Sequence, residues 1–321
     1  MQLGLFTAVF NQMSLDEMLH ALKPLPSITM LEMGAGGWPG QQHLDVDALL
    51  ASSDRAAEFR ARLSDAGYGI SALSCHGNPV HPDQAIAKRD DAIYRRTVRL
   101  AETLHVPVVI TFSGCPGGSA EDRVPNWITA AWPPEYADAL SWQWEQRLIP
   151  YWQEAARVAS DAGVRVALEA HPGFCVYNPE TLLRLRAAAG TALGINMDPS
   201  HLWWQGMDIP AVISALGDSI FHVHAKDVAL DAANTARNGV LDTKSYRQMA
   251  QRSWVFRSVG WGHSELEWKR IVAALRLVGY DYVLSIEHED ALASIEEGLR
   301  SAVDTLSRVL LRQPAVDAWW A

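Results

Sequence analysis

Four short segments of this chain end in residues that bind metal ions or transfer protons. They are residues 167–173, 196–201, 221–227 and 285–290, and each begins with an apolar run typical of a buried strand. One hard-metal ligand candidate lies in each segment, namely Glu169, Asp198, His224 and Glu287. Three carboxylates and one imidazole form an oxygen-rich set. Such a set predicts a single divalent ion, with Mn²⁺ expected first and Mg²⁺, Co²⁺ or Zn²⁺ as alternatives.

A divalent ion at such a site would polarise a carbonyl or hydroxyl oxygen as a Lewis acid. A carboxylate beside that oxygen can then remove and return a proton on the adjacent carbon. Residues two apart on a strand share one face, so His171 should lie above Glu169, and Lys226 above His224. We therefore expect proton-transfer chemistry next to a metal-bound oxygen.

Several of these residues also have a structural alternative. Asp198 could cap the helix that follows it, because carboxylates at strand ends often do so. His222 fits a hydrogen-bonded core histidine better than a ligand. Lys226 and Asp227 could form a structural ion pair, and His171 could serve only to orient its neighbour.

The composition limits the classes of function. The chain has 321 residues, 49% of them hydrophobic and 20% charged, with a formal net charge of −10 and no basic block. That balance argues against nucleic acid as a partner and leaves a small carbohydrate possible. No signal peptide or membrane-spanning run is visible, so we expect a cytoplasmic protein without membrane contact. Three widely spaced cysteines fit reduced thiols.

The segments that would position these residues alternate between strand and helix patterns. Strands are predicted at 2–7, 28–33, 70–75, 106–112, 164–169, 193–197, 220–224 and 282–286. Helices are predicted at 14–22, 47–66, 84–104, 181–189, 209–216, 266–278 and 291–311, the first with Ser14 and Glu17 as a capping box. This repeat predicts an α/β fold, a (β/α)8 TIM barrel, as a single domain over 1–321. A doubly wound open sheet is the alternative, and the absence of a GxGxxG turn after the first strand weakens it.

Two connections, 113–140 and 228–263, are longer than usual. They follow strands 4 and 7, so in a barrel they lie on the face where active sites form, and we expect them to wall a pocket. An oligomer contact is the alternative. The C-terminal region, about 291–321, ends in an apolar tail that should pack on the barrel or on a neighbouring subunit.

The residues that carry chemistry resemble a known family. Glu169, the Asp198-Pro199-Ser200-His201 turn, the His222-Val223-His224 strand and Glu287 resemble the sugar phosphate isomerase/epimerase group of xylose-isomerase-like TIM barrels. The resemblance spans essentially the whole chain. It implies that the four ligand candidates hold one metal ion, and that Glu169 and Glu287 also act as a catalytic acid/base pair.

The resemblance also implies substrate contacts. His201 matches a histidine that holds a substrate oxygen, and His76 lies where several members carry a histidine. Further substrate-binding candidates are Lys226 and Arg257 for charge, and Trp127 and Trp261 for stacking on a sugar.

One stretch departs from the simplest epimerases. Glu169-Ala170-His171-Pro172 is similar to the C-glycoside deglycosidases, in which a histidine two residues after the glutamate ligand is a proposed base and a small accessory subunit is required. We therefore predict a metal-dependent keto-sugar isomerase or epimerase. The alternative is a lyase, either a dehydratase or a 3-oxo-glycoside eliminase.

Two other functions are less favoured. An endonuclease IV-like phosphodiesterase would need an Asp-Arg-His motif, which residues 254–262 lack. A non-catalytic sugar-binding protein would not need the metal ligands. A homo-oligomer or the small accessory subunit is the partner we expect besides the substrate.

Overall fold

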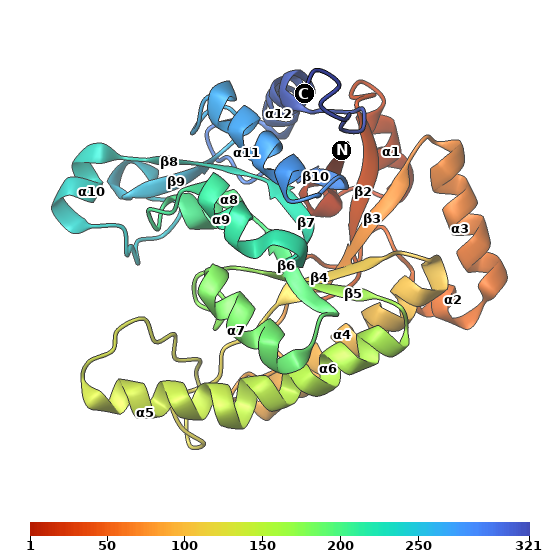
Figure 1. Ribbon diagram of the computed structural model, residues 1–321. Coiled ribbons are helices and arrows are strands. Elements are labelled where there is room, and N and C mark those ends of the chain that lie inside the picture. Colours follow the sequence, from red (N-terminus) through yellow and green to blue (C-terminus); the bar gives the residue numbers. More distant parts are fainter.

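The computed structural model describes residues 1–321 and shows eight parallel strands closed into a barrel (Figure 1). Around the barrel the order is β1-β10-β7-β6-β5-β4-β3-β2. The barrel strands are β1 (Gln2–Phe6), β2 (Ile28–Gly34), β3 (Gly69–Ser74), β4 (Val108–Phe112), β5 (Arg165–Glu169), β6 (Leu193–Met197), β7 (Ile220–Ala225) and β10 (Val283–Ile286). The predicted (β/α)8 barrel is confirmed, and every predicted strand is present to within two residues.

The strands form where they were predicted because helices cover the outside of the barrel and side chains fill its inside. A strand buried on both faces reads as a nearly continuous apolar run, which is easy to recognise. Leu193–Met197, for example, is buried along its whole length. Polar residues inside such a run are therefore unusual, and in this barrel they gather near the carboxyl ends of the strands.

Helices cover the barrel and extend it on one side. They are α1 (Leu15–Leu22), α2 (Val46–Ala51), α3 (Ser53–Asp65), α4 (Gln84–Leu104), α5 (Pro134–Trp142), α6 (Ile149–Asp161), α7 (Pro179–Ala189), α8 (Pro199–Trp203), α9 (Ile209–Leu216), α10 (Ala232–Asn238), α11 (Glu265–Leu277) and α12 (Ile295–Val309). Short turns of helix are η1 (Thr7–Phe10), η2 (Gln143–Leu148), η3 (Gly217–Ser219) and η4 (Met249–Gln251). The capping box of Ser14 and Glu17 before α1 is confirmed.

Two predicted helices differ from the structure. The single helix expected at 47–66 is divided into α2 and α3, because the Ser52 side chain accepts a hydrogen bond from Arg55 N and starts a second helix. The helix expected from residue 291 begins only at Ile295, where Ser294 and Glu297 form a capping box.

The connection after β4 contains helices that the sequence did not reveal. Its second half is α5, which continues through the π-helical turn η2 into α6. Pro150 lies in the first turn of α6, directly after η2. Proline lacks a backbone N–H, and the π-helical turn before it already departs from the regular pattern of α-helical bonds.

The connection after β7 is an ordered arm instead of a bare loop. Within it, β8 (Asp227–Leu230) pairs antiparallel with β9 (Trp254–Arg257), and α10 lies between them. The Asp227 carboxylate fixes its base by accepting backbone hydrogen bonds from Gly260 and His263. In Figure 1 this arm and α5 extend from the same side of the barrel.

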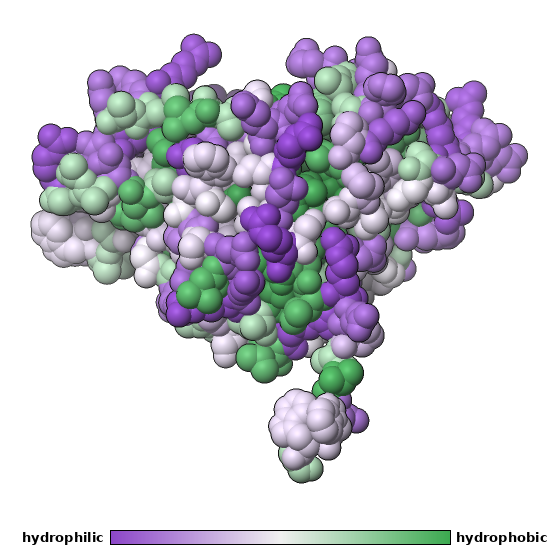
Figure 2. Space-filling view, turned by 90° about the horizontal axis from the view of Figure 1, so that it is seen from above, coloured by the Kyte–Doolittle hydropathy of each residue, from purple (hydrophilic) through white to green (hydrophobic).

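The C-terminal residues follow α12 and leave the body of the molecule, which Figure 2 shows as a short projection. Trp319 and Trp320 are 83% and 71% exposed, so the barrel does not cover this apolar tail. The packing of the tail on a neighbouring subunit stays a prediction. None of the helices combines the length and the apolar content that a membrane span needs.

Candidate metal centre and cavity

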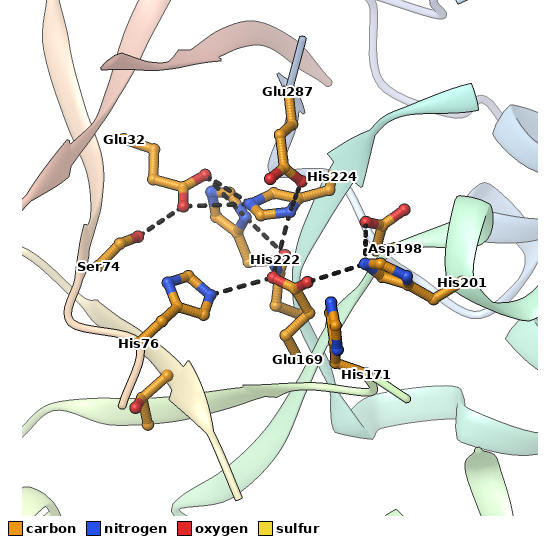
Figure 3. A network of polar contacts seen from close by, with 12 residues as sticks. Glu32, Ser74, His76, Glu169, His171, Asp198, His201, His222, His224 and Glu287 are labelled. Carbon is orange, nitrogen blue, oxygen red and sulfur yellow. Dashed lines mark hydrogen bonds and ion pairs between the residues drawn. The ribbon is translucent and has the colours of Figure 1, made fainter. Parts of the chain in front are cut away.

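The four ligand candidates converge at the carboxyl ends of four strands. Glu169 is the last residue of β5, Asp198 follows β6, His224 lies in β7 and Glu287 follows β10. One ligand atom of each residue lies within 4.8 Å of those of the other three. Figure 3 shows their side chains turned toward a common centre. The closed barrel brings them together because the carboxyl ends of its parallel strands meet at one rim.

Three of these residues have a buried polar atom without a hydrogen-bond partner. These atoms are Asp198 Oδ2, His224 Nδ1 and Glu287 Oε2. They lie close together, His224 Nδ1 being 2.8 Å from Glu287 Oε2, but none has a partner of suitable geometry. Lys226 offsets part of the negative charge here, and a divalent cation bound among the three atoms would supply the partner that their geometry lacks. The donor set therefore fits a hard divalent ion.

The second carboxylate oxygen of Asp198 is bound by the protein backbone. Asp198 Oδ1 accepts a hydrogen bond from Ser200 N at 2.8 Å, so Asp198 caps α8 and still presents Oδ2 to the cluster. Asp198 can therefore cap the helix, as considered from the sequence, and still be a ligand candidate.

Two histidine side chains contact the Glu169 carboxylate. His76 Nε2 lies 3.0 Å from its Oε2, and His201 Nε2 lies 3.3 Å from its Oε1. Burial by itself would raise the pKa of Glu169, but the hydrogen bonds from His201 and His76 and the charge of His224 outweigh it. The pKa of Glu169 is held well below its usual range, so this carboxylate is ionised at neutral pH.

Lys226 lies among the carboxylates with only 2% of its surface exposed. Its Nζ is 3.1 Å from Asp198 Oδ2, 2.9 Å from Glu287 Oε2 and 3.1 Å from Glu289 Oε2. Burial would lower the pKa of Lys226, but these negative charges raise it well above its ordinary value. The pairing with Asp227 considered from the sequence does not form, because the Asp227 carboxylate is taken up by the β8–β9 arm.

Glu32 is the functional candidate that the sequence reasoning missed. It lies on β2 with none of its surface exposed, and its Oε2 is 2.9 Å from His224 Nε2. Ser74 and Ser285 place their hydroxyl groups 2.5 Å and 2.8 Å from the same carboxylate. The signal was available in the sequence, because a glutamate inside an apolar barrel strand needs a polar partner.

A cavity of about 800 Å³ opens above the cluster. Of the four ligand candidates only Glu169 and Glu287 line it, together with His76, His171 and Lys226. The remaining wall is largely aromatic and comes from segments far apart in the sequence: Phe6, Trp38, Phe112, Phe174, Tyr246 and Phe256. The volume is in the range of small-molecule sites, which is about 300–1,000 Å³.

His171 lies on the cavity wall, as its spacing from Glu169 predicts. Its Nδ1 is 2.7 Å from Pro172 O, and its ring centre is 4.1 Å from that of His201. Burial lowers the pKa of His171 to about 3, with a further contribution from His201. The imidazole is therefore neutral at neutral pH.

Four residues expected to bind substrate do not line the cavity, namely Trp127, Trp261, Arg257 and His201. Trp127 lines a separate small cavity and packs edge-on against Tyr177. Trp261 is 63% exposed and donates a hydrogen bond to Ser301, while Arg257 pairs with Asp290 at 3.1 Å. These three side chains therefore contact other parts of the protein, and a role for them in substrate binding stays a prediction. His201 lies behind His171, against Glu169 and Asp198.

This chain is similar to known proteins in sequence and in fold. The sequence model of the family described as "Xylose isomerase-like TIM barrel" matches residues 30–308. The uncharacterized protein YfiH of Bacillus subtilis (strain 168) is 40% identical over 313 residues, which cover 97% of this chain and 99% of that protein. The inosose dehydratase of Geobacillus thermodenitrificans (strain NG80-2) is 28% identical over 140 residues, 43% of this chain and 45% of that enzyme.

Among solved structures, the IolI protein with a bound zinc atom has a TM-score of 0.65 at 19% identity. The match covers 97% of this chain and 98% of that one. At this identity the likeness concerns the fold alone. The extent of the family match, together with the closed eight-stranded barrel, shows that this chain belongs to the xylose isomerase-like TIM barrel family.

Proposed function

We propose that this protein is a divalent-metal-dependent isomerase or epimerase of a keto sugar or a related polyol ketone. One observation carries the proposal: Glu169 and Glu287 are the two members of the ligand cluster that also line the cavity. This arrangement supports a role for both carboxylates in binding a metal ion and a substrate. Mn²⁺ is the ion we expect, because the donor set is rich in oxygen.

Glu169, Asp198, His224 and Glu287 would hold the ion. When bound, the ion supplies Lewis-acid polarisation of a substrate oxygen. Glu169 and Glu287 are both ionised, because their polar contacts hold the pKa of each carboxyl below its usual range. One carboxylate can therefore accept a proton from the carbon next to a carbonyl.

The outcome depends on which group returns the proton. If the second glutamate takes up a proton from solvent and delivers it from the opposite side, the carbon is inverted, which is epimerisation, and the first glutamate then releases its proton to solvent. If the proton returns to the neighbouring carbon, the product is an isomer. Lys226 lines the same cavity and can donate a hydrogen bond to a substrate oxygen, while His76 lines it beside Glu169. The large, partly aromatic cavity fits a small carbohydrate, whose ring faces pack on aromatic side chains.

Proton abstraction can be measured without knowing the product. A panel of ketoses and polyol ketones is incubated in D₂O with Mn²⁺, and deuterium uptake is read by mass spectrometry. We expect uptake that disappears with a chelator and falls about 10²–10⁴-fold in Glu169→Gln and in Glu287→Gln. Glu296→Gln, an exposed residue on α12, is the control. Full uptake in both cavity variants, or uptake indifferent to the chelator, would contradict the proposal.

The second candidate function is a lyase reaction at the same site. The neutral His171 on the cavity wall favours it. Pro172 O accepts the hydrogen on Nδ1, so the Nε2 lone pair is a further base, which proton exchange by the two glutamates does not require. The partial likeness to an inosose dehydratase supports this reading. Such a reaction gives a product lighter by one water or by a released group, whereas isomerisation leaves the mass unchanged.

His171→Ala separates the two candidates. In a lyase we expect the elimination rate to fall about 10²-fold while deuterium uptake stays within about threefold. An equal loss of both rates would mean that His171 serves proton abstraction itself. A homo-oligomer or a small accessory subunit stays a prediction for either reaction, and light scattering on the purified chain would test the first.

A further inference from the structure

A second row of buried polar side chains lies beneath the ligand candidates. It consists of Glu32, His222 and Asn196, which have none of their surface exposed. We call these three residues the support layer. Figure 3 shows the Glu32 carboxylate between Ser74 and the imidazole of His224. Each member of the layer either contacts a ligand candidate or contacts a residue that does.

The first contact fixes His224. Its Nε2 lies 2.9 Å and 3.1 Å from the two carboxylate oxygens of Glu32. A carboxylate can only accept, so Nε2 carries the hydrogen and donates it. In the neutral ring this leaves the lone pair on Nδ1, which is the buried atom without a hydrogen-bond partner in the cluster. Glu32 thereby selects the tautomer that can bind a cation.

The second contact fixes Glu169 through two residues. His222 Nδ1 lies 3.0 Å from Asn196 Oδ1, and Asn196 Nδ2 lies 3.3 Å from Glu169 Oε2. These three side chains come from neighbouring strands in register, since Glu169 pairs with Asn196 and Asn196 pairs with His222. Because the Asn196 amide oxygen is hydrogen-bonded to His222, the amide nitrogen of Asn196 must point toward Glu169.

The two contacts do not depend on the cavity, and no member of the support layer lines it. Glu32 is also held from two further strands, by the hydroxyl groups of Ser74 on β3 and Ser285 on β10. A carboxylate with that many fixed donors cannot rotate freely. Such buried partners of metal-binding histidines commonly orient the ring and raise its basicity.

We propose that the support layer is a positioning device for the metal centre, in which Glu32 orients His224 and the His222–Asn196 pair orients Glu169. The inference rests on the proposed function, because it assumes that these ligand candidates bind a divalent ion. In this assignment Glu32, His222 and Asn196 act only through the two ligands.

The test measures metal binding and does not require turnover. Co²⁺ is titrated into the metal-free chain, its dissociation constant is measured by calorimetry, and its visible absorption spectrum reports the ligand geometry. We expect Glu32→Gln, which keeps the shape and removes the charge, to weaken Co²⁺ binding about 10–100-fold and to change the spectrum. Asn196→Ala should weaken binding about three- to tenfold, the effect of one lost hydrogen bond.

Ser74→Ala is the matched control. It removes one hydrogen bond to Glu32 but leaves the carboxylate beside His224, so binding should change less than about threefold. A purely structural role for Glu32 would lower the melting temperature of the metal-free chain and leave the dissociation constant of the folded protein unchanged. Asn196→Ala tests the second contact independently if Glu32→Gln does not fold.

The outcomes separate this inference from the proposed function. Co²⁺ binding in Glu32→Gln within threefold of the unchanged chain, with the same spectrum, would overturn the inference and leave the function standing. Weakened binding in the variants, combined with no deuterium uptake on any substrate, would support the inference and reject the function. No Co²⁺ binding by the unchanged chain would overturn both.

Discussion

Lys226 Nζ lies 2.9 Å from Glu287 Oε2, the carboxylate oxygen that also faces His224 Nδ1 in the candidate metal centre. The same ammonium group is 3.1 Å from Asp198 Oδ2. Lys226 therefore offsets the charge of two ligand candidates that would otherwise repel each other in a buried site. A divalent cation bound there would face both the attraction of the carboxylates and the repulsion of the lysine.

Lys226→Met should consequently destabilise the metal-free protein and favour the metal-bound protein. The metal-free chain should lose about 3–5 kcal/mol of stability, because removing one partner leaves buried carboxylates without compensation. Mn²⁺ binding should become tighter, since the competing positive charge is gone. Urea unfolding in the presence of a chelator and calorimetric titration with Mn²⁺ measure these quantities.

The control for this substitution is Lys269→Met. Lys269 pairs with Glu265 on the surface at 2.8 Å, and such pairs contribute little to stability. It should alter neither measurement. Weaker Mn²⁺ binding in Lys226→Met would show instead that the lysine holds the ligands in place for the metal.

The loop after β2 offers a test of how His76 is positioned. Gly37 has a φ of +67°, and a Cβ built on it would lie 2.2 Å from the carbonyl oxygen of His76. Gly163 has a nearly identical φ of +68°, with nothing within 4 Å of its Cβ position. Alanine is strained by the backbone conformation at both positions, but only at Gly37 does it also collide with the chain.

We expect Gly163→Ala to cost about 1 kcal/mol of stability and to leave proton exchange unchanged. Gly37→Ala should cost more and should also slow deuterium uptake, because the displaced His76 no longer donates to Glu169 at the observed 3.0 Å. Melting temperatures and uptake rates for the two variants decide the matter. Equal losses of stability with equal uptake would show that the loop tolerates the extra atom.

Buried histidines set the acid sensitivity of the metal-free chain. Burial lowers the pKa of His222 to about 4 and that of His171 to about 3, against about 6.5 in an unfolded chain. Between pH 6.5 and 4.5 the unfolded state therefore binds more protons, so stability falls as the pH falls. His224, whose pKa is raised well above its usual value, is protonated in both states over most of this window and adds little slope.

The lowered pKa values of the buried carboxyl groups take effect only below about pH 4.5, where the unfolded chain begins to bind protons at these groups. Chelator-treated protein should lose about 1.4 kcal/mol per pH unit for a fully buried group such as His222. Urea unfolding at pH 7.5, 6.5, 5.5 and 4.5 would measure this loss of stability, because these conditions include the window of about two pH units in which it occurs. His222→Gln should flatten the slope by about that amount, and an unchanged slope would locate the effect elsewhere.

The sequence by itself determined the barrel and the four ligand candidates. A barrel strand is buried on both faces, so it appears as an apolar run, and parallel strands end at the same rim. Glu169, Asp198, His224 and Glu287 each follow or end such a run, which is why they could be grouped before their distances were known. Periodicity of two also placed His171 above Glu169.

Only the tertiary structure decided which side chains meet across the barrel. Glu32 and His224 are 192 residues apart and bond inside it, because inward-pointing side chains of non-adjacent strands share one interior. Periodicity gives the face that a residue occupies but not its partner on the other side. The positions of Tyr246 and Phe256 in the aromatic wall and the exposure of Trp261 likewise depend on how the β8–β9 arm packs. That packing is set by long-range contacts such as those of Asp227, which no local pattern encodes.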